Sequence, residues 1–400
     1  MPSLVDAQRR HAQHYLTIAI AAQKGFIAGD GDITTTYALL TQELDNIRKG
    51  QKWSARFETS DKPAIALCSA YALAAVPCLT LLQNSAENIK WLSNGLRAAR
   101  HLGERGAEAQ HLDHLASAHD DAGNTTHAIE LYRSALEKHR EQGNRLGEGK
   151  ALGNLGMAHQ ALGHLRRAVE LYETSLMIAI ELQDGRAEAH ALGNLGNVHA
   201  MLGETQRAID FYERALPTFS KLGDVRGESI TLGNLGIAFK NLGDYGRALD
   251  YYQRDLAVAR SIGDSRGEGP TLANIGIIFV KLGDHDQAKS CFQRSHSIAQ
   301  SVGDRHGEAD GMSRIGALHA DSNNVDSALK CYEQALTIYR EIGNLKGEGE
   351  TLWNISLIAD QRGNRAGAIV NAEHALDLLR RVGSPLAEVV REHLVQWRLI

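Results

Sequence analysis

The stretch GNRLGEGKALGNLGMAHQALGHLRRAVELYETSLMIAIEL, residues 143–182, decides how most of the chain folds. Leu152 and Leu155 belong to a run of apolar residues at helical spacing, which predicts a first helix over 146–162. A second run with the same spacing predicts a second helix over 166–182, and a glycine separates the two runs. The stretch is therefore expected to form a helical hairpin.

This hairpin pattern repeats along the chain with a fixed period. Residues 103–382 align at a shift of 40 as seven copies without an insertion or deletion. One column holds alanine in every copy: Ala128, Ala168, Ala208, Ala248, Ala288, Ala328 and Ala368. Because a single hairpin cannot bury both of its faces, the copies are expected to stack on one another into a solenoid.

Other columns indicate how each copy is built. Gly163 lies where a helix must end, and glycine tolerates the left-handed backbone that such an end requires. Asn144 is predicted to cap the first helix, and the negative charge of Glu148 in its first turn suits the helix dipole. The small Gly156 lets the two helices approach closely, and we expect Tyr172 to fill the space beside it.

These columns resemble those of the tetratricopeptide repeat (TPR) family. Gly156, Ala168 and Ser175 occupy the places of that family's small-residue signature, and LGNLG at 152–156 is similar to its Leu-Gly-Asn variant. The unit here has 40 residues instead of about 34, and the family's usual terminal proline is absent. The resemblance implies an all-α fold, namely a right-handed α-solenoid of TPR-like helix-turn-helix repeats.

The ends of the chain follow the repeat frame less closely. The last segment restarts the first-helix pattern and then stops, which predicts a C-terminal capping helix. An alanine-rich segment ahead of the array fits the frame loosely, as a degenerate TPR-like repeat. The expected division is an N-terminal helical segment at 1–62, the degenerate repeat at 63–102, seven repeats at 103–382 and the capping helix at 383–400.

The front of the chain carries a second resemblance. RRHAQHYLTIA at 9–19 and LTQELDNIRKGQKW at 40–53 are similar to the region that precedes the TPR array in bacterial signal-transduction ATPases with numerous domains (STAND). In those proteins the resemblance implies that the array senses a partner and relieves autoinhibition. An alternative role for this chain is therefore the ligand-sensing, autoinhibitory module of a STAND-type signalling ATPase whose nucleotide-binding domain is encoded elsewhere.

Charge and cysteine usage limit the classes of partner. Lys and Arg number 43 against 48 Asp and Glu, and no basic stretch stands out, so nucleic-acid binding is not expected. The four cysteines form no CxxC motif, which is typical of reduced, buried residues in a cytoplasmic protein: Cys68, Cys78, Cys291 and Cys331. The uncharged segment 63–82 is rich in alanine and contains a proline, so it predicts a buried helix and no membrane span.

Two motifs in the sequence suggest catalysis. NRLGEGKA at 144–151 departs from a phosphate-binding loop at its first and last positions and coincides with the turn between repeats. His111, His114 and Asp120 have zinc-ligand chemistry, which leaves a metal-dependent enzyme as a third alternative. The nearby His119 belongs to a repeat column and is expected to pack. We therefore expect no catalytic residues, no cofactor and no metal.

The TPR resemblance implies where a ligand binds. In that family the first helices line the concave face, so we expect a non-catalytic scaffold that holds an extended segment of a protein or peptide partner there. Carried over by column, the groove residues are Lys150, Asn154, Asn194, Asn197, Asn234, Ile237, Lys240, Asn241, Asn274, Ile277, Lys281, Arg314 and Asn354.

Five of these residues form an asparagine ladder, with one amide in each of five first helices: Asn154, Asn194, Asn234, Asn274 and Asn354. An amide offers both a donor and an acceptor, which suits the backbone of an extended peptide. The alternative is that the asparagines bond to neighbouring helices and fix the superhelix. Lys240 and Lys281 lie in the repeat frame beside Ile237 and Ile277, and this basic and apolar patch favours a partner with acidic and apolar residues.

Overall fold

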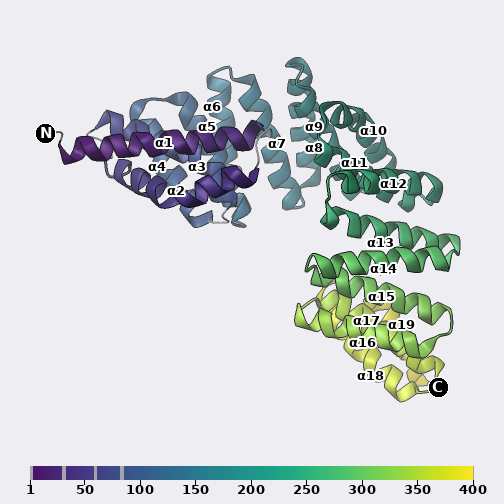
Figure 1. Ribbon diagram of the computed structural model, residues 1–400. Helices are drawn as coiled ribbons and strands as arrows, with labels where there is room; N and C mark the ends of the chain where they lie inside the picture. The colour runs from purple at the N-terminus through teal and green to yellow at the C-terminus, as the bar shows by residue number, and fades with distance from the viewer. Residues whose placement is uncertain (1–2, 29–32, 58–60, 82–84, 400) are drawn as a thin grey trace. The chain divides into compact units, whose positions relative to one another are not determined.

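The computed structural model describes residues 3–28, 33–57, 61–81 and 85–399, and these residues form nineteen helices and no strand. Contacts between residues divide the chain into two compact units, 1–218 and 219–400. Each unit is a stack of antiparallel helices, in which successive helices pack on one another from α1 to α9 and from α11 to α19 (Figure 1). The predicted all-α solenoid of helix-turn-helix repeats is confirmed within each unit.

The helices of the first unit begin with a longer pair and continue as regular hairpins. They are α1 (Leu4–Ala28), α2 (Ile33–Ser54), α3 (Lys62–Leu81), α4 (Ser85–Leu102), α5 (Arg105–Asp121), α6 (Thr125–Glu141), α7 (Arg145–Ala161), α8 (Leu165–Glu181) and α9 (Gly185–Met201). Helix α10 (Thr205–Leu222) runs across the boundary between the units.

The second unit contains hairpins of the same kind and a final single helix. Its helices are α11 (Val225–Asn241), α12 (Tyr245–Ser261), α13 (Ser265–Leu282), α14 (His285–Ser301), α15 (Arg305–Asp321), α16 (Val325–Glu341), α17 (Leu345–Gln361), α18 (Arg365–Arg381) and α19 (Leu386–Leu399). Helix α19 packs on α18, and the ring of Trp397 lies 5.7 Å from that of Trp353. The division of the chain into four segments, with boundaries after residues 62, 102 and 382, stays a prediction.

The hairpin of the second copy starts one residue earlier than its apolar pattern predicts. Helix α7 begins at Arg145 because Asn144 caps it: the side-chain oxygen of Asn144 accepts a hydrogen bond of 3.0 Å from the backbone N–H of Gly147. Gly163 ends the hairpin's first helix with a φ of 75°. The predicted cap and the predicted left-handed glycine are both confirmed.

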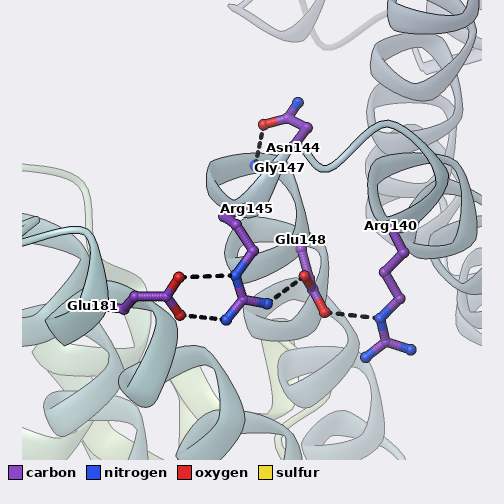
Figure 2. A network of polar contacts seen from close by, with 6 residues as sticks. All are labelled: Arg140, Asn144, Arg145, Gly147, Glu148 and Glu181. Atoms are coloured by element: carbon purple, nitrogen blue, oxygen red, sulfur yellow. Dashed lines mark hydrogen bonds and ion pairs between the residues drawn. The ribbon is translucent and has the colours of Figure 1, made fainter.

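The glutamate column joins neighbouring helices, a role that the helix dipole alone does not predict. Glu148 accepts a hydrogen bond of 2.8 Å from Arg140 of α6 and one of 2.5 Å from Arg145 of its own helix (Figure 2). Arg145 also pairs with Glu181 at the end of α8. The contact from α6 to α7 recurs at the same spacing in other copies: Arg100 with Glu108, Arg260 with Glu268 and Arg340 with Glu348.

The small-residue column lies against the aromatic column, as the sequence predicts. The Tyr172 side chain is fully buried, and a Cβ added to Gly156 would lie 2.6 Å from its Cε1 atom. The same contact recurs in four further copies: Gly196 with Tyr212, Gly236 with Tyr252, Gly276 with Phe292 and Gly316 with Tyr332. Only glycine lets the first helix approach the ring this closely.

Two glycines of α9 provide a test of this seam. A Cβ at Gly196 would lie 2.5 Å from Tyr212, whereas a Cβ at Gly193 would meet nothing within 4 Å. We expect Gly196→Ala to lower the free energy of unfolding by about 1–3 kcal/mol through overpacking. Gly193→Ala, three residues away, is expected to raise it by up to about 1 kcal/mol, because alanine favours a helix. Urea titrations of both variants measure the difference, and a gain from Gly196→Ala would contradict the seam.

The alanine-rich segment forms α3, which is buried in the first unit. Its Tyr71 is fully buried and donates a 2.6 Å hydrogen bond to the carbonyl oxygen of Ala12 in α1. Within the described ranges, no helix has the length and apolarity to cross a membrane. Residue 82, at the end of the predicted helix, lies outside the described residues.

The cysteines differ in burial more than the sequence predicts. Cys68 is buried and is a free thiol. Cys291 and Cys331 are also free thiols, but they are only half-buried, because the second helices that carry them expose part of this column. The predicted full burial is wrong for these two residues. The side chain of Cys78 lies outside the described side chains.

Candidate functional site

The first unit contains a groove between the first helices of two neighbouring copies. The cavity has a volume of about 530 Å³, and residues of α7, α8 and α9 line it. We call it the first groove, and its lining includes Leu146, Lys150, Asn154, Met157 and Asn194. It therefore contains the predicted residues of copies two and three at Lys150, Asn154 and Asn194.

The first groove combines apolar side chains with amides. Met157 is 47% exposed and Leu146 is 45% exposed, so both present apolar surface to a ligand. Asn154 and Asn194 are half-buried, and neither side chain has a hydrogen-bond partner among the described residues. Lys150 is exposed and likewise has no charged partner there. Such a surface suits a chain with polar backbone groups and apolar side chains.

The second unit contains a groove with more charge. Its cavity has a volume of about 560 Å³, and residues of α13, α14 and α15 line it; the residues used below are Arg266, Asn274, His306, Asp310 and Arg314. In this second groove, Asp310 accepts a 2.5 Å hydrogen bond from the hydroxyl of Tyr339, and the Nη2 atom of Arg314 lies 3.9 Å from the Asp310 carboxylate. The Nε atom of Arg314 is buried without a hydrogen-bond partner. This guanidinium is therefore only partly satisfied.

The charge of Arg314 acts on Lys240, a second cation of the same unit. Lys240 of α11 is half-buried, and no carboxylate of the described residues pairs with it. Burial lowers the pKa of Lys240, and the positive charge of Arg314 lowers that pKa further. A negative group beside Lys240 would therefore be stabilised, because it would offset the repulsion between the two positive charges.

The remaining predicted groove residues line neither cavity. They are Asn197, Asn234, Ile237, Lys240, Asn241, Ile277, Lys281 and Asn354. The side-chain oxygen of Asn197 accepts a 2.7 Å hydrogen bond from the hydroxyl of Tyr212, so this amide supports the fold. Ile237 is 40% exposed, and Asn241 and Lys281 are exposed.

The asparagine ladder separates into two groups. Asn234 makes an interaction of its own within the chain. The side chains of Asn154, Asn194, Asn274 and Asn354 are half-buried, and none hydrogen-bonds to another residue in the described part of the chain. Since bonds to neighbouring helices do not explain these four amides, they remain available to a ligand.

Sequence reasoning missed three polar residues of the second groove, although the repeat frame contained the signal. Asp310 occupies the column of Lys150, and Arg266 and His306 occupy the column of Leu146. These columns vary in charge from copy to copy. Variable columns on the first helices are therefore the places where the copies differ in what they can bind.

The metal alternative finds no support among the described residues. His111 is fully buried, and its Nε2 atom lies 2.9 Å from the hydroxyl of Ser69. Asp120 accepts a 2.7 Å hydrogen bond from Thr125. Across the described ranges, no group of three or more His, Cys, Asp or Glu side chains is placed to hold a metal ion. Of the segment 144–151, Asn144 caps α7 and the remaining residues form the start of that helix.

Hairpins that stack in register and present their first helices as grooves define a helical-repeat scaffold of the α-solenoid class. The sequence model of the tetratricopeptide repeat matches residues 107–181, 147–221, 187–261, 227–301, 267–341 and 307–381. The chain belongs to the tetratricopeptide repeat family.

Solved structures with a similar fold include several regulatory proteins. A STAND protein with a tetratricopeptide repeat sensor from Pyrococcus horikoshii has a TM-score of 0.63 at 16% identity, and the match covers 88% of this chain and 54% of that one. The apo quorum sensor NprR from B. thuringiensis has a TM-score of 0.60 at 13% identity, and the match covers 94% of this chain and 100% of that one.

Aspartyl phosphate phosphatase F from Bacillus subtilis has a TM-score of 0.56 at 11% identity, and the match covers 84% of this chain and 95% of that one. At identities this low, the likenesses show the fold alone. In a search of curated proteins, none matches the chain.

Proposed function

We propose that this chain is a non-catalytic scaffold that holds an extended segment of a partner protein along the first helices of its repeats. One observation carries the proposal: half-buried amides in the grooves, at Asn154, Asn194 and Asn274, have no protein partner among the described residues. A peptide backbone supplies a donor and an acceptor at each residue and so matches these amides.

The chemistry of the two grooves supports a partner with both apolar and acidic residues. The first groove presents Met157 and Leu146, which suit an aliphatic side chain. In the second unit, the charges of Lys240 and Arg314 repel each other, no described carboxylate pairs with Lys240, and the exposed Lys281 adds a third positive charge. An acidic side chain of the partner would relieve this repulsion.

Charge reversal in the second unit tests the proposal. Extended peptides are selected from a displayed library on the wild-type chain, and their affinities are measured by calorimetry. We expect selected peptides to contain Glu or Asp beside apolar residues. Lys240→Glu/Lys281→Glu is expected to lower their affinity by about tenfold or more, because two attractions become repulsions.

The matched control is Lys289→Glu/Lys330→Glu, which makes the same change in charge at two exposed lysines of second helices. This control is expected to bind within about twofold of the wild type. Equal affinities of the wild type and the Lys240→Glu/Lys281→Glu variant would contradict an acidic partner in this unit.

A second candidate function is the sensor of a STAND-type ATPase. The similarity to a STAND protein with a tetratricopeptide repeat sensor over 88% of this chain favours it. The test is to search the same and neighbouring genes for a P-loop ATPase and to measure its ATP hydrolysis with and without this chain. Inhibition that a groove-binding peptide relieves is expected, and unchanged hydrolysis would contradict this role.

A further inference from the structure

A surface of different chemistry lies in the N-terminal part of the first unit. Helices α2 and α4 both pack on α3, and a cleft of about 840 Å³ opens between residues 45–56 of α2 and the segment after it and residues 86–94 of α4. We call it the α2/α4 cleft. None of its lining residues belongs to the first or the second groove.

The α2/α4 cleft is positively charged, although the whole chain has a net charge of −5. Arg48 is neutralised, because its Nε and Nη2 atoms donate to Glu87 at 2.9 and 2.7 Å and its Nη1 atom lies 3.7 Å from Asp45. Four further cations line the cleft, are exposed, and have no charged partner in the part of the chain that the structure describes: Lys49, Lys52, Arg56 and Lys90.

A buried amide in the same cleft also lacks a partner. Gln51 is among the residues that line the cleft, although it is only 3% exposed, and its Nε2 atom is buried without a hydrogen-bond partner. An unmade hydrogen bond of this kind is costly, so a ligand that brings an acceptor to this depth is stabilised there. The apolar part of the lining comes from Ala55, Ala86 and Trp91.

We propose that the α2/α4 cleft binds an acidic peptide segment of a partner protein. Carboxylates of the segment pair with the four exposed cations, and one of its backbone carbonyl groups accepts a hydrogen bond from Gln51. This site is separate from the grooves, so it does not depend on the function proposed for them.

Two other anionic partners fit the cleft less well. A single-stranded nucleic acid needs exposed aromatic faces for its bases, and Trp91 is only 4% exposed. A membrane surface needs protruding apolar side chains around the basic residues, and the described lining of this concave cleft has no exposed large apolar side chain. A peptide segment supplies both the carboxylates that the four cations attract and the hydrogen-bond acceptor that Gln51 lacks.

A labelled peptide of glutamate and leucine tests the assignment by fluorescence anisotropy on the full chain. We expect Lys52→Glu/Lys90→Glu, with one change on each wall, to weaken binding by about tenfold or more, and added salt to weaken it further. Lys289→Glu/Lys330→Glu, with the same change in charge elsewhere, is expected to bind within about twofold of the wild type. Unchanged affinity of the Lys52→Glu/Lys90→Glu variant would overturn the proposal.

An acidic partner is also proposed for the second unit, so the site of binding must be mapped. When the peptide binds, hydrogen exchange is expected to slow in α2 and α4 of the wild type. The same slowing is expected in the Lys240→Glu/Lys281→Glu variant, and Gln51→Leu is expected to reduce it. Protection confined to α11–α15 would overturn the cleft proposal and leave the groove proposal standing. Tighter binding of an oligo-dT strand or of phosphatidylserine vesicles than of the peptide would overturn the choice of partner.

Discussion

Replacing Tyr172 by alanine is expected to lower the free energy of unfolding by about 3–5 kcal/mol, the range for removing a large buried ring. The side chain is fully buried and packs directly on Gly156 of the facing helix. Because glycine has no side chain that can move into the space, the cavity is expected to remain open. The hydroxyl of Tyr172 also donates a 3.0 Å hydrogen bond to the side-chain oxygen of Gln160.

Two phenylalanine variants separate the ring from the hydroxyl. Tyr172→Phe keeps the ring and loses one hydrogen bond, so a loss of about 1 kcal/mol is expected. Tyr252→Phe is expected to cost nothing or to stabilise, because the buried hydroxyl of Tyr252 has no partner. If Tyr172→Ala were no worse than Tyr172→Phe, the ring would not hold the two helices of the hairpin together.

The measurement must respect the repeat architecture. Each hairpin contacts mainly its neighbours, so a long array can lose cooperativity and a single free energy of unfolding can lose its meaning. Hydrogen exchange in α7 and α8 reports the local stability directly, and urea midpoints report the global effect. Both are expected to fall for Tyr172→Ala, with the larger effect in α7 and α8.

The period of 40 residues made most of the fold predictable from sequence. Gly163 and Asn144 act through their own backbone conformation and capping chemistry, which are local properties. Local rules did not reveal that Glu148 joins α6 to α7, because that contact depends on Arg140 in the preceding copy. Repeat columns identify positions with a shared role, but the role follows from the stacking.

The candidate site was less predictable than the fold, because its residues differ in what surrounds them. Asn197 was expected in the groove, but its side chain bonds to Tyr212, whereas Asn154 and Asn194 have no such partner. The positive α2/α4 cleft was not predicted, since its charges come from two helices that are distant in sequence. Net charge and local charge runs do not detect such a convergence.

Acidification is expected to destabilise the first unit through His111. This histidine is fully buried against Gly95, and burial lowers its pKa from the ordinary 6.5 to about 4, with a smaller contribution from the charge of His114. In the unfolded chain His111 takes up a proton below about pH 6.5, whereas in the folded chain it resists until about pH 4. The unfolded state therefore binds more protons in this window, and stability falls as the pH falls through it.

The expected loss is on the order of 3 kcal/mol between pH 6.5 and pH 4, and it levels off below pH 4. His111→Gln removes the titration and keeps a polar group within reach of Ser69, so its stability is expected to depend less steeply on pH. His114, His119 and His159 also have lowered pKa values, mainly through burial. They make stability depend on pH in both the wild type and the His111→Gln variant. The difference between the two curves isolates His111.

Urea midpoints at several pH values between 4 and 7 measure this difference, and hydrogen exchange assigns it to α3, α4 and α5. The exposed His285 of the second unit provides the matched control, since His285→Gln is expected to leave the slope unchanged. Parallel curves for the wild type and His111→Gln would contradict a buried, neutral His111. A narrowing advantage of the wild type as the pH falls is the expected result, because only the wild type must keep the His111 imidazole unprotonated inside the fold.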